Sequence, residues 1–468
     1  MTAIHTIDVP ITFDELTEPE VLPEETPPFS VIVHPDFWGT KNLQRIRDYG
    51  LANLVAPTGL VAATLSRVIA ATPPNVQGPG RTEQASTGHS LNMFLGLLGP
   101  SGAGKSTAIA HARTLFPAHA SSGDAIDIDG VELGSGQGAE RIWFEKVDED
   151  QRPVAGRGKG TYEQTRNRIL FVVGEAETLS RLDQMSGSTL GAVMRKMFGG
   201  EPLGTAWADQ DKRACFTEAG SYRAVLQFAL QPGLIDTLLG GQNAETGTAG
   251  RLLWAPVIDH ALPHPSQAPK SPPPFTRNDW RCPSGKPVVF KLPAAVRTEM
   301  DNLNHARATG IMTVPAIDTH RVVIRQSVAA ALALLENPDA DTISQDDWDR
   351  SGMLLVVSDQ IREAAMTYSA AQSALKVRRE GHKEAARQIA RDDVLAKEQV
   401  GRDEKIRSRI INNLKGSGPI AGSKLRGKFS GPERSEFDRV IDDLIDDGFV
   451  TKSEVGNGRR YSLAGPES

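Results

Sequence analysis

The sequence predicts an α/β fold in which a mostly parallel sheet is flanked by helices. Three stretches carry this prediction. Leu95–Leu98 is an apolar run that passes through a glycine-rich turn into a helical pattern beginning near Lys105. Ile169–Val173 and Tyr222–Leu230 are two further apolar runs, of the kind found in strands that are buried on both faces. Such strands, separated by helical stretches, are typical of a parallel sheet.

Length and composition limit the class of protein. A chain of 468 residues is too long for one core and predicts two to four domains. The two cysteines, Cys215 and Cys282, lie far apart and match no metal-binding spacing, so we expect a reduced protein without disulfides. The sequence shows no membrane span, and Met1–Pro10 lacks the basic and apolar parts of a signal peptide. We therefore expect a soluble, cytoplasmic protein with no membrane partner.

The turn after the first apolar run matches the pattern G-x-x-x-x-G-K-[ST] of phosphate-binding loops. Its glycines allow the backbone to approach phosphate oxygens closely, and the start of the following helix adds a positive end. Lys105 is predicted to contact the β- and γ-phosphates, Ser106 to ligate Mg²⁺, and Thr107 to help cap the helix. The predicted binding residues for ATP and Mg²⁺ are Gly99, Pro100, Ser101, Gly102, Ala103, Gly104, Lys105, Ser106 and Thr107.

Two glutamates follow the second apolar run at the end where open α/β sheets bind their ligands. Glu175 is predicted to activate water or to ligate Mg²⁺, and Glu177 to belong to the same catalytic cluster. Gly174 stands where an aspartate is usual in such a site, so metal contact is either indirect or made by Glu175. The alternative is a pair of solvated glutamates at the end of a strand.

Two later residues are further catalytic candidates. Gln231 ends the third apolar run and is predicted to sense the γ-phosphate, with an ordinary turn before a proline as the alternative. Arg251 is predicted to act as an arginine finger on a neighbouring subunit. Lys212 and Arg213 are rival candidates for that role, and a surface salt bridge is the alternative for all three cations.

A glycine-rich stretch at Leu133–Arg141 is similar to the signature loop of transport ATPases, but it follows the phosphate-binding turn too closely in the sequence. We expect instead a turn that caps a helix including Ala139–Phe144. Four cations of the preceding helical region, Lys41, Arg45, Arg47 and Arg67, are expected on a solvated face.

Shifts in composition divide the chain into seven segments. An acidic, proline-containing stretch predicts a disordered tail, and a proline-rich internal stretch predicts a stiff linker. Apolar residues at regular spacing predict packed domains. The predicted segments are a disordered tail (1–30), an N-terminal helical cap (31–88), the P-loop ATPase core (89–262), a proline-rich linker expected to be extended rather than packed (263–287), a helical lid (288–375), a charged helical linker (376–402) and a winged-helix domain (403–468).

The last segment contains three helical patterns and a hairpin around Gly456–Gly458, an order that is similar to a winged helix. The second of these helices is expected over Ile420–Phe429. Aspartates on the third helix would repel a duplex, so a protein-binding winged helix is the alternative. Candidate phosphate contacts for DNA are Lys424, Arg426, Lys428, Arg434, Arg439, Lys452, Arg459 and Arg460.

The order of four features resembles a family of RecA-like ATPases from actinobacterial plasmids, phages and integrated elements, a domain family of unknown function often linked to primase-polymerase modules. The features, within Phe37–Tyr368, are Phe37-Trp38, Ser90-Leu91-Asn92 before the glycine-rich turn, the strand with Glu175 and Glu177, and Gln231-Pro232 followed by Arg251. The resemblance implies a RecA-like core, DNA bound in a core channel, a homo-oligomer with a hexameric ring as one form, and replication proteins such as a primase as partners.

The function hypothesis is an ATP-dependent DNA helicase or helicase-like replication initiator of a mobile element. The first alternative is a nucleotide switch that loads partners on DNA without translocating. A small-molecule kinase is the second; the winged-helix-like end and the lack of a recognisable acceptor site argue against it.

Overall fold

The computed structural model describes residues 29–117, 126–148, 150, 152–154, 160–174, 189–204, 215–232, 235, 249–415, 417–456 and 458–465. The chain forms two compact units, which meet between Ser373 and Ala374. We call them the core unit and the tail unit and describe each by itself. Apart from Phe29 and Ser30, the predicted disordered tail lies outside the described residues. Phe29 is buried, with its ring 6.0 Å from that of Tyr368.

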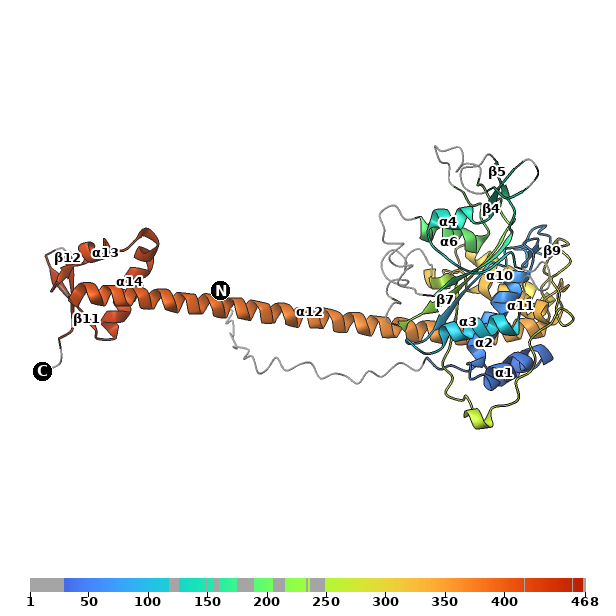
Figure 1. Ribbon diagram of the computed structural model, residues 1–468, viewed down its shortest axis with the longest axis horizontal. Helices are drawn as coiled ribbons and strands as arrows, with labels where there is room; N and C mark the ends of the chain where they lie inside the picture. Colours follow the sequence, from blue (N-terminus) through green and yellow to red (C-terminus); the bar gives the residue numbers. More distant parts are fainter. Residues whose placement is uncertain are drawn as a thin grey trace. The chain divides into compact units, whose positions relative to one another are not determined.

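The core unit contains a five-stranded parallel sheet with the order β3-β6-β7-β2-β8. Figure 1 labels β7 of this sheet and the helices of the same unit. Its strands are β2 (Met93–Leu98), β3 (Ile128–Glu132), β6 (Arg168–Val173), β7 (Arg223–Leu230) and β8 (Leu252–Pro256). Every residue of β2, β7 and β8 is buried, as the apolar runs predicted. The α/β prediction, with a parallel sheet flanked by helices, is thus confirmed.

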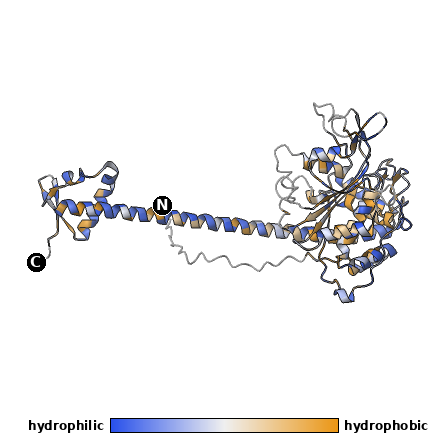
Figure 2. Cartoon of the chain, viewed as in Figure 1, coloured by the Kyte–Doolittle hydropathy of each residue, from blue (hydrophilic) through white to orange (hydrophobic). Residues whose placement is uncertain are grey.

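Helix α2 (Pro57–Ala71) is the centre of the helical layer. All of its residues are buried, and it packs against the sheet and three other helices, α1 (Lys41–Ala52), α3 (Lys105–Leu115) and α11 (Arg321–Glu336). A helix that is apolar on all sides is typical of such a buried position, and Figure 2 shows the apolar colour concentrated in this layer and in the sheet. The smaller elements of this unit are η2 (Pro35–Trp38), β1 (Val76–Gln77), α4 (Gly136–Arg141), β4 (Phe144–Val147), β5 (Thr161–Gln164), α6 (Leu190–Gly199), η4 (Ala249–Arg251), η5 (Pro265–Gln267), β9 (Val288–Val289), α10 (Ala294–Ala308) and η6 (Ala316–Asp318).

The solvated face predicted for the cap cations is wrong for two of them. Arg67 is almost fully buried and forms an ion pair with Asp129 of β3 at 2.9 Å, and Arg113 of α3 reaches the same carboxylate at 3.1 Å. Arg45 places its guanidinium 4.3 Å from the ring centre of Phe275. These cations therefore hold α1 and α2 to the rest of the core unit.

The proline-rich segment also packs more closely than predicted. Phe275 and Trp280 are buried, and their rings lie 5.6 and 4.9 Å from that of Phe116 at the end of α3. The two aromatic side chains anchor this otherwise extended segment on the core unit.

The helix predicted to include Ala139–Phe144 is shorter than expected. Helix α4 begins after Ser135, whose hydroxyl accepts from the amide of Gly138, and it ends at Arg141. Phe144 instead starts β4, which pairs antiparallel with β5. The expected cap is present, and the helix ends early because the hairpin begins.

The tail unit has its own apolar cluster. Helix α12 (Gln345–Lys415) spans the boundary between the units, and its last turns contribute Ile406, Ile410 and Leu414 to this cluster. The other elements are β10 (Ile420–Ala421), α13 (Gly422–Arg426), α14 (Gly431–Asp446), β11 (Val450–Val455) and β12 (Gly458–Leu463).

Three short strands form a sheet in the tail unit with the order β10-β12-β11. The predicted hairpin is confirmed as β11 and β12. The second predicted helix starts later than expected because Ile420 pairs with Tyr461 of β12. None of the helices that the structure describes combines the length and the apolar character needed to cross a membrane.

Candidate functional site

The phosphate-binding loop predicted at Gly99–Ser106 connects β2 to α3 at the edge of the sheet where the parallel strands end, which we call the carboxyl edge. Gly104 has φ +90°, a left-handed conformation that side chains disfavour. Gly99 lies against β8, since a Cβ there would approach Val257 Cγ2 to 2.6 Å. Both glycines are thus required by the path of the loop.

Helix α3 begins without a side-chain cap. Its N-cap residue is Gly104, so the cap predicted from Thr107 is wrong. Ser106 and Thr107 are exposed in the first turn. Since no described side chain caps this helix, its first-turn amides are available to an anion, and the helix dipole favours negative charge at this point.

The Lys105 side chain turns back into the loop. It is 8% exposed, and its ammonium group donates to the carbonyl oxygens of Gly99 at 2.8 Å and Pro100 at 2.7 Å. Burial lowers the pKa of Lys105 from its ordinary value. Within the part of the chain that the structure describes, the partners of this buried ammonium are the two neutral carbonyls, and no described carboxylate forms an ion pair with it. This arrangement favours binding of an anion.

Gln231, which the sequence predicts to sense the γ-phosphate, directly follows β7, and the end of β7 is hydrogen-bonded to the loop. The Gly99 amide donates to the carbonyl oxygen of Leu230, the residue before Gln231, at 3.2 Å. On the other side of β2, the Val257 amide donates to Leu98 at 3.2 Å. The carboxyl ends of β2, β7 and β8 are therefore held together around the loop.

The strand that leads to the predicted acidic cluster ends at the same edge. Val173 of β6 pairs with Phe228 of β7, which places Gly174 near the carboxyl edge, two strands away from β2. Adjacent strands are about 4.8 Å apart, so the ends of β2 and β6 are separated by about 10 Å. A Cβ on Gly174 would meet no atom within 4 Å. Glu175 and Glu177, and also Lys212 and Arg213, lie outside the described residues.

Arg251 lies at the opposite, amino edge of the sheet. It precedes β8, whose first residue, Leu252, pairs with Phe94 near the start of β2. Arg251 is therefore level with Met93, and the six residues from Met93 to Gly99, at about 3.3 Å each, place its backbone about 20 Å from this chain's own loop. Its guanidinium lies 5.9 Å from the ring centre of Phe198, and burial is the main cause that lowers its pKa.

Sequence reasoning missed Glu132, which ends β3 at the carboxyl edge. A cavity of about 520 Å³ lies beside it, also lined by Ser135, Arg141 and Phe171. The stretch Ile128–Glu132 has no continuous apolar run because β3 is the outermost strand and only partly buried. Among the described residues, no three His, Cys, Asp or Glu side chains form a metal-binding group.

The fold and the loop define an α/β protein with a phosphate-binding loop between a buried strand and a helix. No family model matches the chain, and no curated protein matches it. It is similar to the solved ORC2 protein of Aeropyrum pernix, in ADPNP-ADP complexes, with 13% identity and a TM-score of 0.23 over 88% of this chain and 90% of that one. It is also similar to "SCCmec type IV Cch - active helicase", with 10% identity and a TM-score of 0.21 over 92% of this chain and 69% of that one. Likenesses at these TM-scores carry no weight for fold or function.

Proposed function

We propose that this chain is an ATP-hydrolysing, DNA-associated motor or replication initiator with a RecA-like core. The observation that supports it most is the buried Lys105 ammonium, held by loop carbonyls at the uncapped start of α3. A triphosphate would supply the negative charge that the described surroundings of this ammonium lack.

The residues around the loop fit magnesium-bound ATP. Lys105 would bind the β- and γ-phosphates, and the exposed Ser106 hydroxyl, together with phosphate oxygens, would hold Mg²⁺. The metal ion would neutralise charge on the phosphates. Gln231 follows the strand bonded to the loop and would contact the γ-phosphate. Glu175, just beyond the end of β6 at the same edge of the sheet, would orient a water molecule toward the γ-phosphate.

The tail unit supports an association with DNA. Its order of helix, strand, two helices and hairpin is compatible with a winged helix. Two of the predicted phosphate contacts are engaged by acids: Arg426 pairs with Asp438 at 2.8 Å, and Arg439 with Asp403 at 2.5 Å. These pairs make the helices poor candidates for DNA contact.

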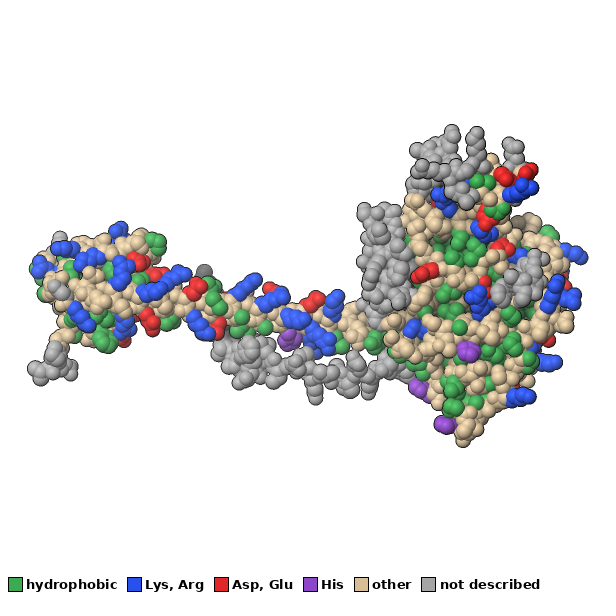
Figure 3. Space-filling model, viewed as in Figure 1, with side chains coloured by type: hydrophobic (Ala, Val, Ile, Leu, Met, Phe, Trp, Pro, Cys, Tyr) green, Lys and Arg blue, Asp and Glu red, His purple; other side chains and the backbone are tan. Residues whose placement is uncertain are grey.

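The hairpin of the tail unit is the better candidate surface. Lys452, Arg459 and Arg460 are exposed on it, and no ion pair with a described residue engages them. Figure 3 shows Lys and Arg side chains spread over the visible face of this unit. We therefore assign the phosphate contacts to β11 and β12.

The proposed motor acts as a homo-oligomer, with a hexameric ring as one form. Arg251 supports this because its backbone lies about 20 Å from the loop of its own chain, so that an arginine finger at this position would act on a neighbouring copy. A primase is a proposed partner of such a ring.

The test measures ATPase rate against added single-stranded and double-stranded DNA, with molecular mass determined in the same buffers. The proposal predicts an oligomer whose turnover rises with DNA. A monomer whose ATPase rate is unchanged by DNA would contradict the proposal of a motor.

A non-translocating nucleotide switch is the second candidate. Gly174 favours it, because the residue after β6 supplies no carboxylate where such sites usually have an aspartate, and metal-dependent turnover would then be slow. An oligomer that binds DNA, but whose ATPase rate is unchanged by it, would support this candidate.

A further inference from the structure

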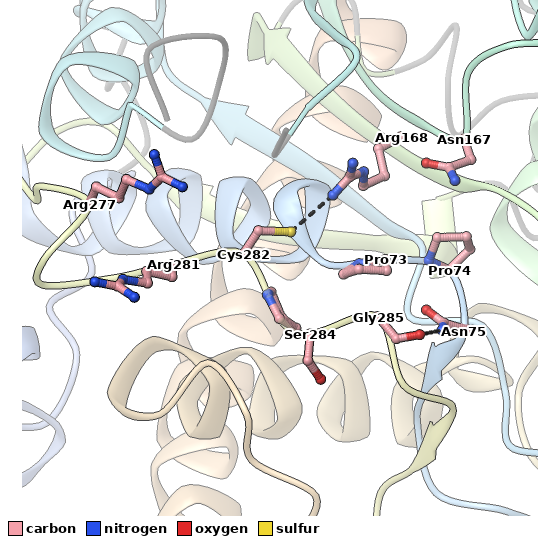
Figure 4. Close-up of a pocket in the computed structure, with 11 residues that line it drawn as sticks. Pro73, Pro74, Asn75, Asn167, Arg168, Arg277, Arg281, Cys282, Ser284 and Gly285 are labelled. Carbon is pink, nitrogen blue, oxygen red and sulfur yellow. Dashed lines mark hydrogen bonds between the residues drawn. The ribbon is translucent and has the colours of Figure 1, made fainter. Parts of the chain in front are cut away.

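The structure contains a second cavity suited to phosphate, at the amino edge of the sheet. It has a volume of about 630 Å³, within the range of small-ligand sites, and we call it the arginine pocket. Its lining includes three arginines, Arg168, Arg277 and Arg281, together with Cys282, and no lining residue is acidic. Figure 4 shows Arg277 and Arg281 on one side of Cys282, and Arg168 with Asn167 on the other.

Arg168 is the most buried cation of the pocket. Its guanidinium donates to Cys282 Sγ at 3.0 Å and to the carbonyl oxygen of Ala71 at 3.4 Å, and it lies 3.8 Å from Asp127. Its Nε atom is buried and has no hydrogen-bond partner in the structure as described. One carboxylate at that distance leaves most of the donor capacity of this side chain unused.

Arg277 and Arg281 add two exposed cations at the rim. Within the part of the chain that the structure describes, neither forms an ion pair. Guanidinium groups present planar pairs of N–H donors that match phosphate oxygens, and several together suit a dianion better than a carboxylate. The rings of Pro73, Pro74 and Pro283 add an apolar lining that a base or sugar can contact.

We propose that the arginine pocket binds the phosphate of a nucleotide unit, either a free mononucleotide or a residue of a single strand. The site is separate from the Lys105 loop, because the six residues of β6 span about 20 Å between the two edges of the sheet. The inference does not depend on ATP hydrolysis at that loop.

Cys282 provides a local reporter of occupancy. The chain has two cysteines, and Cys215 is buried whereas Cys282 is partly exposed in the pocket. An anion there would block access to the thiol and weaken the stabilisation of its thiolate by Arg168, and both effects slow alkylation. The rate of iodoacetamide labelling at Cys282, measured by peptide mass spectrometry on the full chain, therefore reports binding.

The experiment compares inorganic pyrophosphate, dTMP and a dT₁₂ oligonucleotide as protecting agents. At ten times the Kd of a probe, labelling of Cys282 should slow about tenfold. Protection by dTMP and dT₁₂ alike assigns a free nucleotide, and protection by dT₁₂ alone assigns a single strand. Labelling that none of the three probes slows would overturn the proposal.

Variants locate the effect. Arg277→Gln with Arg281→Gln should abolish protection of Cys282 by every probe that protects the wild type. The matched control, Arg81→Gln with Lys270→Gln, removes the same charge from exposed positions outside the pocket and should leave protection unchanged. Protection that survives in the first double variant would also refute the proposal. Lys105→Ala separates the two sites: it should abolish ATP turnover and retain protection of Cys282.

Discussion

Replacing Lys105 by methionine tests the phosphate site most directly, because it removes the ammonium and keeps most of the apolar stem. The ammonium has three N–H donors, and two of them bond to the Gly99 and Pro100 carbonyls. The third can reach a phosphate without breaking either bond. A charge-assisted hydrogen bond contributes about 2 kcal/mol, so Lys105→Met should weaken ATP binding about 30-fold.

Ligand-linked unfolding measures this change. At ATP one hundred times the wild-type Kd, binding stabilises the folded chain by about 2.7 kcal/mol, and a 30-fold weaker variant retains about 0.9 kcal/mol. All six tryptophans precede Ala374, so their fluorescence during urea unfolding follows the core unit alone. Lys270→Met removes an exposed ammonium and serves as the control. An equal increase in the free energy of unfolding with ATP in wild type and in Lys105→Met would refute the assignment of the site. An ATPase rate of Lys105→Met equal to that of wild type would also refute it.

The lowered pKa of Lys105 gives a second, nucleotide-free result. Below its ordinary pKa of 10.5 there is a pH range in which the unfolded chain holds this proton and the folded chain has released it. The free energy of unfolding rises with pH wherever the unfolded state binds more protons. Wild type should therefore gain stability relative to Lys105→Met as the pH rises toward 10.5. A difference that is constant or falls with pH would show that burial does not disfavour the ammonium.

Three other variants test the surroundings of the site and the tail unit. Gly174→Asp places a carboxylate in open space after β6 and should lower the Mg²⁺ concentration for half-maximal ATPase activity about tenfold, with Gly174→Asn as the uncharged control. The same Mg²⁺ dependence as in wild type would mean that the end of β6 does not contact the metal. Alanine at both Arg459 and Arg460 should weaken duplex binding and lower its salt slope by about 1.8, measured by fluorescence anisotropy, whereas equal affinity and slope would favour a protein partner. Arg67→Ala leaves Asp129 buried beside a single arginine and should lower the free energy of unfolding, measured in urea, by about 3 kcal/mol. Arg67→Met with Asp129→Leu should have a free energy of unfolding close to that of wild type. Equal losses in the two variants would mean that packing contributes more to stability here than the ion pair.

The parts of the fold that could be predicted are those whose signal is local. Strands β6 and β7 each appear as one apolar run because both of their faces are covered. The phosphate-binding loop is recognised from the spacing of its glycines and from one lysine. Strand β3 gave no such run because it is the outermost strand of the sheet.

Contacts between distant segments could not be predicted in the same way. Arg67 and Asp129 are separated by 62 positions, and Arg168 and Cys282 by 114. The sequence next to each arginine is apolar, but it does not indicate which distant residue becomes the partner. Burial decides the role of each, and burial depends on which segments the fold brings together. The role of Glu175 remains a prediction, because this residue lies outside the part of the chain that the structure describes.

Phosphate binding at the two edges of the sheet should depend on side chains to different degrees. At the carboxyl edge, amides at the start of α3 can bind phosphate even when Lys105 is replaced, so that variant should retain partial affinity. At the amino edge, α2 ends at Ala71, and the carbonyl end of a helix disfavours anions. The charge of an anion in the arginine pocket therefore has to be balanced by the guanidinium groups of Arg168, Arg277 and Arg281. Removing Arg277 and Arg281 should consequently abolish binding there, whereas removing Lys105 only weakens it at the loop.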